Sequence, residues 1–356
     1  MTAERKGGRR HLKKTAAAVF AAVLAAALPC AAGGGAAWAA PSVQPTEEEA
    51  LSFADVHGAL RVEGADLVDS KGENIQLKGV STHGLSWFPQ YVNRETFRTL
   101  RDDWNANCVR LALYTDEYNG YCSGGNKEEL KNLVDRGVSY AGELGMYVIV
   151  DWHVLNDRDP NVHKADALAF FDEMAQRWKD RDNVIYEICN EPNSGTTWEG
   201  VKAYAKEVIP VIRKHDPDAV VIVGTPSWSQ DVDRALDSPL EFDNVMYALH
   251  FYAGTHTDWL RDKCEECVEN GLPVFISEFG MCDASGNGAN DFDQAARWME
   301  LARKWNLSYI CWNLADKNET SSMLKPGGGK LSRWTEEDLS ESGQWIRKQL
   351  RGEHSR

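Results

Sequence analysis

Two glutamates follow short apolar segments of the chain and stand among other residues that could do chemistry. Glu191 lies in the run Asn190-Glu191-Pro192, and Glu278 lies in the run Ser277-Glu278-Phe279-Gly280. Hydrolysis of a glycosidic bond needs two carboxyl groups, because one protonates the leaving oxygen while the other supports or attacks the anomeric carbon. One of them must keep its proton near neutral pH, and the other must stay ionised. The two runs together predict a glycosidase.

Other polar and aromatic residues are expected at the ends of neighbouring apolar segments. One such residue at a strand end is common and needs no functional reason. Six strands that all end this way are hard to explain by packing, so we expect the side chains to meet in one site. The residues, in addition to the two glutamates, are Arg110, Asp151-Trp152-His153, Asn190, His250, Tyr252 and Trp312.

The residue types suggest how the two carboxyl groups differ. Arg110 and the Tyr252 hydroxyl are expected to hold Glu278 as the anion. Asn190 is placed to bond the sugar 2-hydroxyl, an interaction that strengthens in the transition state. Glu187, in contrast, is expected to be an ion-paired or solvated residue and not a catalytic one.

The elements that must position these residues follow a regular order. Apolar, β-branched runs alternate with amphipathic helical patterns, which is typical of parallel strands with crossover helices. Eight such units favour a closed (β/α)₈ TIM barrel, whose active site lies at the carboxyl ends of the strands. A hairpin that joins 60–68 to 74–78 is expected to close the barrel floor. The strand runs are 75–80, 108–113, 147–150, 184–188, 220–223, 245–249, 274–276 and 309–311, and the helical segments include 95–104, 128–144, 165–179, 201–214 and 293–304.

The chain is expected to begin with an export signal. Residues 1–40 combine a basic start, an apolar run at 16–28 and small residues, so we expect cleavage near Ala39 or Ala40 and a secreted, extracellular protein. The apolar run is short for a membrane anchor, which is the alternative. An acidic lead-in is expected at 41–54, one catalytic domain at 55–351 and a tail at 352–356.

Charge and cysteine content limit the partners. Removing a leader with six basic residues and one acidic residue changes the formal charge from −15 to −20. Such a surface repels nucleic acid and anionic membranes, so we expect a neutral substrate and a soluble monomer. Seven cysteines would remain, and their odd number requires a free thiol. Cys264 and Cys267 have metal-like spacing but no second ligand pair, so neither metal nor cofactor is expected.

Six stretches of the chain carry recognisable motifs in order: T-H-G-L-S-W (82–87), N-C-V-R-L-A-L-Y (107–114), D-W-H (151–153), V-I-Y-E-I-C-N-E-P-N (184–193), M-Y-A-L-H-F-Y-A-G-T-H (246–256) and W-N-L-A-D-K-N-E-T-S-S (312–322). Together they resemble glycoside hydrolase family 5, specifically subfamily 2, the bacterial endoglucanases (cellulases) of the Bacillus type. The resemblance covers residues 57–348. Phe279 and Ser277 depart from the Trp and Thr that are common beside the family's nucleophile.

The resemblance implies roles for individual residues. It makes Glu191 the acid/base and Glu278 the nucleophile, and it implies an aromatic platform at Trp228 on the far side of the cleaved bond. Tyr114 and His256 match residues slightly further along that side. The positions that surround the cleaved sugar are Arg110, His153, Asn190, His250, Tyr252 and Trp312, those that hold glucose on the non-reducing side are His83, Trp87, Lys317 and Glu319, and Ala284 is a further substrate-binding position.

These observations predict a secreted retaining endo-β-1,4-glucanase that acts on soluble or amorphous cellulose-like glucan. Thirteen tryptophans supply apolar rings on which sugar faces can stack. The first alternative keeps the mechanism but takes mannan, xylan or mixed-linkage β-glucan as the main substrate. A non-catalytic carbohydrate-binding barrel is the second alternative. A metal-dependent hydrolase that uses His83, His153 and His250 is the third.

Overall fold

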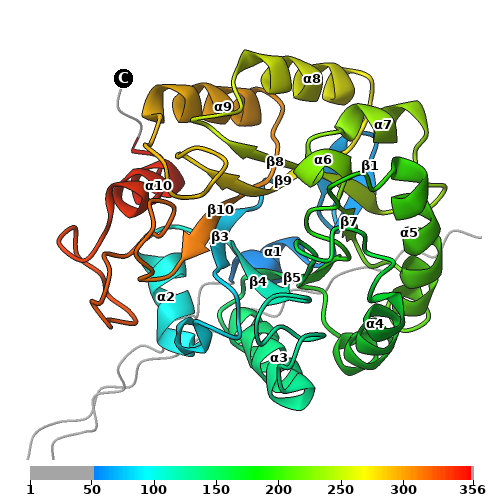
Figure 1. The fold of residues 1–356 in the computed structure, drawn as a ribbon, viewed down its shortest axis with the longest axis horizontal. Helices are drawn as coiled ribbons and strands as arrows, with labels where there is room; N and C mark the ends of the chain where they lie inside the picture. The colour runs from blue at the N-terminus through cyan, green and yellow to red at the C-terminus, as the bar shows by residue number, and fades with distance from the viewer. Residues whose placement is uncertain (1–51, 354–356) are drawn as a thin grey trace, which may run out of the picture. The chain divides into compact units, whose positions relative to one another are not determined.

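Eight parallel strands close on themselves to form the barrel expected from the sequence (Figure 1). The structure is a computed structural model, and it describes residues 52–353. Each strand pairs with its neighbours in chain order, and the last pairs with the first. The strands are β3 (Lys78–Thr82), β4 (Cys108–Tyr114), β5 (Tyr147–His153), β6 (Val184–Glu187), β7 (Val221–Val223), β8 (Val245–Tyr252), β9 (Val274–Gly280) and β10 (Tyr309–Leu314).

The strands are buried on both faces, which explains their continuous apolar sequence. All seven residues of β5 and all seven of β9 are buried. Adjacent backbones approach closely at Gly79 in β3, where a Cβ atom would lie 1.8 Å from the carbonyl oxygen of Cys108. Glycine at this position therefore allows β3 and β4 to pair.

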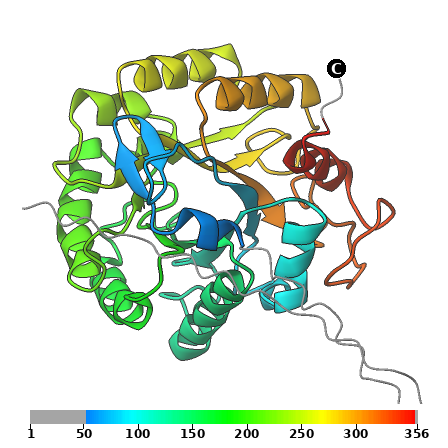
Figure 2. The same cartoon turned by 180° about the vertical axis from the view of Figure 1, so that it is seen from behind.

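Helices form a ring outside the strands (Figures 1 and 2). Side-chain caps mark several of their starts. Asn126, Thr197 and Ser340 each accept a hydrogen bond from a backbone N–H of the following turn. The elements are α1 (Phe53–His57), α2 (Arg94–Asp102), α3 (Lys127–Glu143), α4 (Lys164–Trp178), α5 (Trp198–Arg213), α6 (Pro226–Ser229), α7 (Val232–Asp237), α8 (Asp258–Glu269), α9 (Phe292–Lys304), α10 (Glu341–Arg351) and a 3₁₀ turn at Pro89–Tyr91.

The N-terminal hairpin is present, but its expected bounds are wrong. Its strands are β1 (Arg61–Glu63) and β2 (Asp66–Val68), and Asn74 forms only an isolated bridge with Val68. Gly64, at φ +63°, allows the chain to reverse within residues 60–68, so both hairpin strands lie in that range. Residues 74–78 instead lead into β3 of the barrel. Figure 2 shows the hairpin and α1 lying across the amino-terminal end of the barrel, as expected for a floor.

The barrel floor has its own apolar core. Leu67 and Leu77 pack in one cluster with side chains of the barrel strands, including Tyr147 and Ile149. This cluster is separate from the larger core between strands and helices. Burial of the hairpin against the strand ends therefore stabilises the end of the barrel opposite the site.

Replacing Leu77 with alanine is expected to lower the free energy of unfolding by about 3 kcal/mol, since the side chain is fully buried and leaves a cavity. Denaturant unfolding followed by tryptophan fluorescence measures the change. Val56→Ala is the control, because Val56 is 37% exposed, and we expect it to change stability by less than about 0.5 kcal/mol. A loss below about 1 kcal/mol for Leu77→Ala would contradict a packed floor.

The ends of the chain bear on the expected domain bounds. The export signal at 1–40 lies outside the described residues. Most of the expected lead-in, residues 41–51, also lies outside the described residues, and the first described helix begins at Phe53 after its cap Ser52. The last helix, α10, ends at Arg351. Among the described residues, no helix is long and apolar enough to cross a membrane.

The cysteines occupy apolar positions. Within residues 52–353 all seven are free, and six of them are buried. Cys264 and Cys267 lie on the buried face of α8 and belong to the main core. The expectation that Cys108, Cys189 and Cys311 are small core residues is confirmed.

Candidate active site

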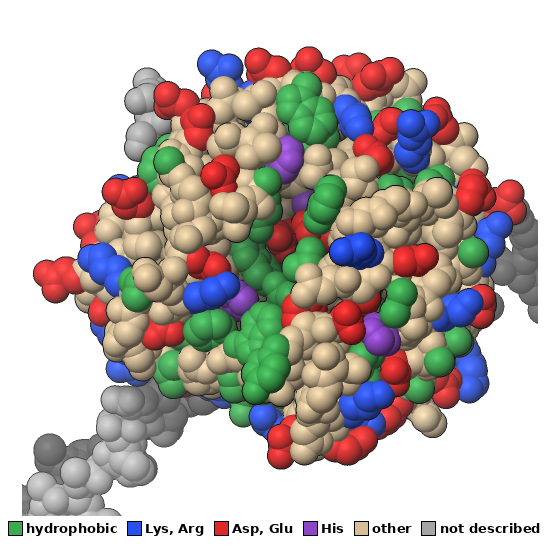
Figure 3. All heavy atoms as spheres, in the orientation of Figure 1, with side chains coloured by type: hydrophobic (Ala, Val, Ile, Leu, Met, Phe, Trp, Pro, Cys, Tyr) green, Lys and Arg blue, Asp and Glu red, His purple; other side chains and the backbone are tan. Residues whose placement is uncertain are grey.

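A cleft of about 720 Å³ opens at the carboxyl ends of the strands. Figure 3 shows it as a hollow in which apolar, acidic and histidine side chains meet. Arg110 and Asn190 lie beneath its surface with no exposed area. The other fourteen predicted site residues line it: His83, Trp87, Tyr114, His153, Glu191, Trp228, His250, Tyr252, His256, Glu278, Ala284, Trp312, Lys317 and Glu319.

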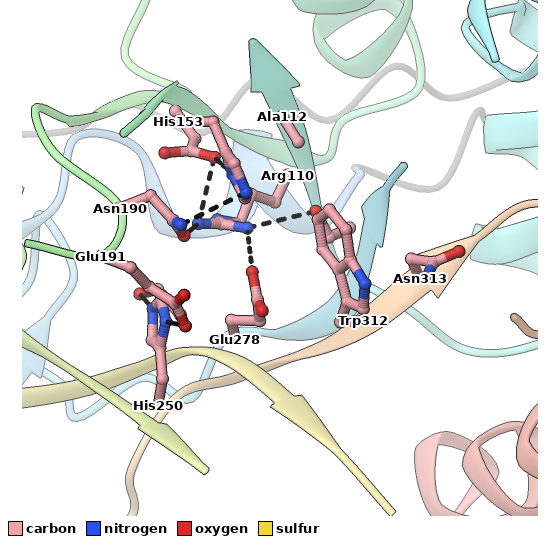
Figure 4. Close-up of polar contacts among 12 residues, drawn as sticks. Arg110, Ala112, His153, Asn190, Glu191, His250, Glu278, Trp312 and Asn313 are labelled. Carbon is pink, nitrogen blue, oxygen red and sulfur yellow. Dashed lines mark hydrogen bonds and ion pairs between the residues drawn. The ribbon is translucent and has the colours of Figure 1, made fainter. Parts of the chain in front are cut away.

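Glu191 and Glu278 face each other across the cleft floor (Figure 4). One carboxylate oxygen of Glu191 and one of Glu278 lie within 4.8 Å of each other. In retaining glycosidases the two carboxyl groups are about 5–5.5 Å apart, whereas inverting enzymes separate them by about 6.5–9.5 Å to admit a water. The spacing is therefore of the retaining kind.

Arg110 connects the carboxylates below the cleft. Its Nε donates to Glu187 Oε2 at 2.6 Å, its Nη1 to Glu278 Oε2 at 3.1 Å, and its Nη2 to Asn190 Oδ1 at 2.6 Å. Asp151 Oδ2 lies 3.1 Å from the same Nη2. Burial opposes the charge, but these three carboxylates raise the pKa of Arg110. The guanidinium therefore stays charged and links β4 to carboxylates of β5, β6 and β9.

The expected position of Arg110 at a strand end is wrong. It is the third of seven residues in β4, and the strand continues to Tyr114. The strand run expected at 108–113 already contained Arg110, and the structure places it inside the barrel, where carboxylates neutralise its charge and the strand continues past it. Arg110 accordingly supports the cleft from below.

Glu278 lies where its ionised form is favoured. Its carboxylate is 4% exposed and accepts hydrogen bonds from Arg110 and, at 2.8 Å, from the Tyr252 hydroxyl. Burial raises the pKa of this carboxyl, but the charges of His250 and Arg110 and the Tyr252 hydrogen bond outweigh it, so the pKa is lowered. The expectation that Arg110 and Tyr252 contact Glu278 is confirmed.

Glu191 has the opposite environment. Burial, together with the negative charge of Glu278, raises its pKa, although a hydrogen bond with His250 opposes the rise. His250 Nδ1 lies 2.9 Å from Glu191 Oε1, and its Nε2 lies 2.9 Å from Ser277 Oγ, which donates to Glu187. Burial opposes the charge of the imidazole, but Glu187 and Glu191 raise the pKa of His250 to about 9. The two glutamates thus have pKa values shifted apart, as acid and nucleophile require.

His153 and Asn190 form a second supporting pair. His153 Nδ1 lies 2.6 Å from Asp151 Oδ2. Burial and the charge of Arg110 lower the pKa of His153, so its ring is neutral and Nε2 accepts from Asn190 Nδ2 at 3.2 Å. The Asn190 amide also donates to the carbonyl of Val154 at 3.2 Å. Both amide hydrogens are therefore engaged, and a sugar hydroxyl would share one of them.

An aromatic wall lies on one side of the cleft. The rings of Tyr114 and His153 have centroids 4.0 Å apart, those of Trp87 and Tyr114 4.7 Å, and those of His153 and Trp312 5.3 Å. His83 packs against Trp312 at 5.1 Å. The wall combines apolar ring faces with polar edges, which suits a pyranose ring.

A polar group adjoins this wall. Lys317 Nζ lies 2.6 Å from Glu319 Oε2 and 3.2 Å from His83 Nε2. Burial raises the pKa of Glu319, but hydrogen bonds from His83 and Lys317 outweigh it and bring the pKa to about 2. The sequence placed these residues together only through family resemblance, and the structure brings them within contact distance.

Trp228 and Ala284 lie on other loops of the cleft. Trp228 is 45% exposed on the short helix α6, where Ser227 and Trp228 both have positive φ. The backbone N–H of Trp228 donates to the carbonyl of Pro192, next to Glu191, at 3.0 Å. Ala284 N–H donates to Thr255 Oγ1 at 2.9 Å, which fixes its loop.

Sequence reasoning missed Glu117, a further acidic residue of the cleft wall. It is 8% exposed and accepts a hydrogen bond from the Asn156 N–H at 2.9 Å. Burial raises its pKa to about 7. It lies in a loop after β4, and only the position of that loop above the cleft would have indicated it.

Two described groups have ligand atoms close enough to hold a metal ion. The first is Glu191, His250 and Glu278, where His250 Nδ1 is already paired with Glu191, and the Glu278 carboxylate accepts from Arg110 and Tyr252. The second is Cys122, His163 and Asp166. Lys127 already pairs with Asp166, and burial raises the pKa of the Cys122 thiol to about 12. The donor chemistry of both groups is poor for a metal.

Comparison with known proteins agrees with the geometry. The sequence model of the family described as cellulase (glycosyl hydrolase family 5) matches residues 68–318. The chain belongs to glycoside hydrolase family 5. Among family relatives, endoglucanase A of Butyrivibrio fibrisolvens is 52% identical, with 83% of this chain and 69% of that protein covered. The endoglucanase of Clostridium saccharobutylicum is 46% identical, with 84% and 66% covered.

Solved structures of this kind superpose well. Cellulase Cel5C_n has a TM-score of 0.80 and 46% identity, with 83% of this chain and 92% of that chain covered. The catalytic domain of Thermobifida fusca endoglucanase Cel5A, solved as a variant in complex with cellotetraose, has a TM-score of 0.80 and 37% identity, with 84% and 99% covered. The barrel of this family 5 protein therefore matches its relatives over almost their whole solved domains.

Proposed function

We propose that this family 5 protein is a secreted, retaining endo-β-1,4-glucanase that hydrolyses internal bonds of cellulose-like β-glucans. The observation that carries the proposal is the pair Glu191 and Glu278, whose oxygens lie within 4.8 Å and whose pKa values are shifted in opposite directions. The relatives named endoglucanase support the substrate class.

Glu278 and Glu191 act in the first step. The Glu278 carboxylate attacks the anomeric carbon and forms a glycosyl ester, while Glu191 gives its proton to the glycosidic oxygen as that bond breaks. The leaving chain departs as an alcohol. Arg110 and Tyr252 hold Glu278 in position and keep it ionised before the attack.

The second step reverses these roles. Glu191, now a carboxylate, takes a proton from water, and the resulting hydroxide attacks the anomeric carbon. The ester bond to Glu278 breaks and restores its carboxylate. Each step inverts the anomeric carbon once, so the product keeps the β configuration. His250 lies 2.9 Å from Glu191 Oε1 and stabilises the carboxylate form of Glu191.

The wall residues bind the sugars. Trp87 and Trp312 offer ring faces on one side of the cleaved bond, and Trp228 offers one on the other. Tyr114 was expected on the Trp228 side, but its ring packs against Trp87 at 4.7 Å and extends the wall of Trp87 and Trp312 instead. Because the cleft is open, a long glucan can lie across it, which supports attack on internal bonds. The polar residues proposed to bind sugar hydroxyls are His83, His153, Asn190, His256, Lys317 and Glu319, with Ala284 as a backbone contact.

A bell-shaped pH profile is expected for kcat/KM. Activity falls at low pH as Glu278 gains a proton, below its ordinary pKa, and at high pH as Glu191 loses one, above its ordinary pKa. Tyr252→Phe removes a hydrogen bond that lowers the pKa of Glu278, so the acidic limb moves to higher pH. The maximum falls about tenfold. An acidic limb that stays in place would contradict the role of Tyr252.

The experiment that tests the function compares polymers. Reducing-sugar release and viscosity are measured on carboxymethyl cellulose, barley β-glucan, glucomannan and xylan. A rapid fall in viscosity with little reducing sugar on the cellulose derivative is expected for endo-cleavage. Cleavage of mannan or xylan without cleavage of the glucans would overturn the substrate but keep the mechanism. Binding of oligosaccharide with no cleavage of any polymer would indicate a binding barrel.

We also propose that residues 1–40 direct export and that the mature protein acts outside the cell as a monomer, without nucleic acid or membrane partners. The basic and apolar pattern of that segment supports the proposal. N-terminal sequencing of protein from culture medium is expected to begin just after Ala39 or Ala40. Full-length protein retained in the cell would contradict export.

A further inference from the structure

Exposed aromatic side chains of the described residues gather around the cleft. Six large apolar residues in residues 52–353 are more than a third exposed, and three of them are aromatic: Tyr118, Trp228 and Trp259. Trp228 lines the cleft itself, and the carbonyl of Tyr118 accepts a hydrogen bond from the cleft residue Trp87. Trp259 is 50% exposed and has no place in the mechanism above.

Trp259 continues the cleft wall outward. It is the second residue of α8, and its ring lies 5.8 Å from that of His256, at an angle of 67°. His256 lines the cleft and is 5% exposed. In Figure 3, apolar side chains lie between the hollow and the upper edge of the molecule, where α8 runs in Figure 1.

Contacts fix α8 relative to the segment that carries Trp228. Lys263 Nζ, one helical turn after Trp259, lies 3.3 Å from the carbonyl of Gln230 and 3.1 Å from Asp231 Oδ1. Gln230 also lines the cleft, two residues after Trp228. Trp228 and Trp259 therefore stand on two elements that are tied together on the same side of the site.

His256 supplies a polar group beside the Trp259 ring. Its Nδ1 accepts a hydrogen bond from the Tyr252 N–H at 2.7 Å, so its ring proton is on Nε2. Its carbonyl accepts from Trp298 Nε1 at 2.8 Å, which fixes the backbone. A ring face next to a fixed donor matches a pyranose, which has apolar C–H faces and hydroxyls at its rim.

We infer that Trp259, together with His256, forms an outer subsite that binds a glucosyl unit of the β-1,4-glucan chain beyond the unit at Trp228. The inference rests on the proposed function. Its occupant is the polymer substrate itself, because the ring adjoins the cleft in which that chain lies. The subsite therefore contributes to binding only when the substrate is long enough to reach it.

Substrate length provides the test. We compare kcat/KM on cellohexaose and on an aryl cellobioside, whose leaving group ends near Trp228, for wild type, Trp259→Ala and Trp259→Phe. Trp259→Ala is expected to lose about threefold to tenfold on cellohexaose and less than about twofold on the short substrate. Trp259→Phe, which keeps a smaller ring, is expected to fall between wild type and Trp259→Ala on cellohexaose. Leu331→Ala removes another exposed apolar side chain and is the control. We expect its kcat/KM to be unchanged on both cellohexaose and the aryl cellobioside.

The possible outcomes separate the subsite from the function. Wild type that cleaves cellohexaose, with Trp259→Ala equal to it on both substrates, overturns the subsite and leaves the function intact. Equal losses on both substrates also overturn it, since they indicate a structural role for Trp259. Wild type that is inert on both substrates means that the proposed function fails, and the subsite with it.

Discussion

Replacing Glu278 with glutamine is expected to lower kcat on carboxymethyl cellulose by about 10⁴-fold or more, because an amide cannot form the glycosyl ester. Glutamine keeps the size of the side chain and can still accept from Tyr252, so we expect the fold to persist. Initial rates of reducing-sugar release measure the loss, and the melting temperature checks the fold.

Glu117→Gln is the matched control for Glu278→Gln. Glu117 is also a buried glutamate of the cleft wall, but it has no role in either step. We expect it to lose less than about tenfold, a change that packing alone can cause. Comparable losses for the two variants, or a Glu278→Gln enzyme that keeps a few per cent of wild-type activity, would remove Glu278 from the nucleophile role.

Replacing Glu191 with alanine is expected to lower kcat on cellohexaose by about 10²–10⁴-fold, since both proton transfers lose their catalyst. The loss should depend on the leaving group. A 2,4-dinitrophenyl cellobioside needs no acid in the first step, so the glycosyl enzyme forms and then accumulates. Azide needs no deprotonation to attack, and it should restore turnover and give a β-glycosyl azide.

Stopped-flow release of dinitrophenol measures the burst, and the sugar product is identified by nuclear magnetic resonance. Glu187→Gln is a second control, because Glu187 is buried in the same network but faces Arg110 and Ser277. Azide should have no effect on it. An α-glycosyl azide from Glu191→Ala, or a rate that azide does not change, would contradict the assignment of Glu191 as acid/base.

The barrel was predictable because its elements are locally consistent. Strands such as β5 and β9 are buried along their whole length, and this leaves continuous apolar runs in the sequence. Helices such as α3 and α5 show one buried face and a capping residue at the start. Eight alternations of these two patterns are compatible with few folds other than a closed barrel.

The two glutamates and their neighbours were predictable for a related reason. In a barrel, the carboxyl ends of all strands meet at one face, so polar residues at those ends converge even when they are distant in sequence. Glu191 follows β6 and Glu278 lies in β9, and the structure brings an oxygen of each within 4.8 Å of a ring nitrogen of His250. The family motifs added the residues of the loops, such as Lys317 and Glu319.

Other features depended on partners that sequence patterns do not reveal. Arg110 lies inside β4 because carboxylates from other strands neutralise it there, and no local signal shows that. Glu187 was expected to be ion-paired or solvated, and the structure shows it buried and paired with Arg110. Glu117 and Trp259 gain their positions from loops and helix ends above the cleft.

The central claim is that Glu278 forms a covalent bond to the sugar. A 2-deoxy-2-fluoro-cellobioside with a good leaving group slows the second step more than the departure of that group, so the glycosyl enzyme persists. Mass spectrometry of the digested protein should find the added fluorocellobiosyl group on the peptide that contains Glu278, and no adduct on Glu278→Gln. An adduct on another residue, or none while wild type cleaves carboxymethyl cellulose, would contradict the account.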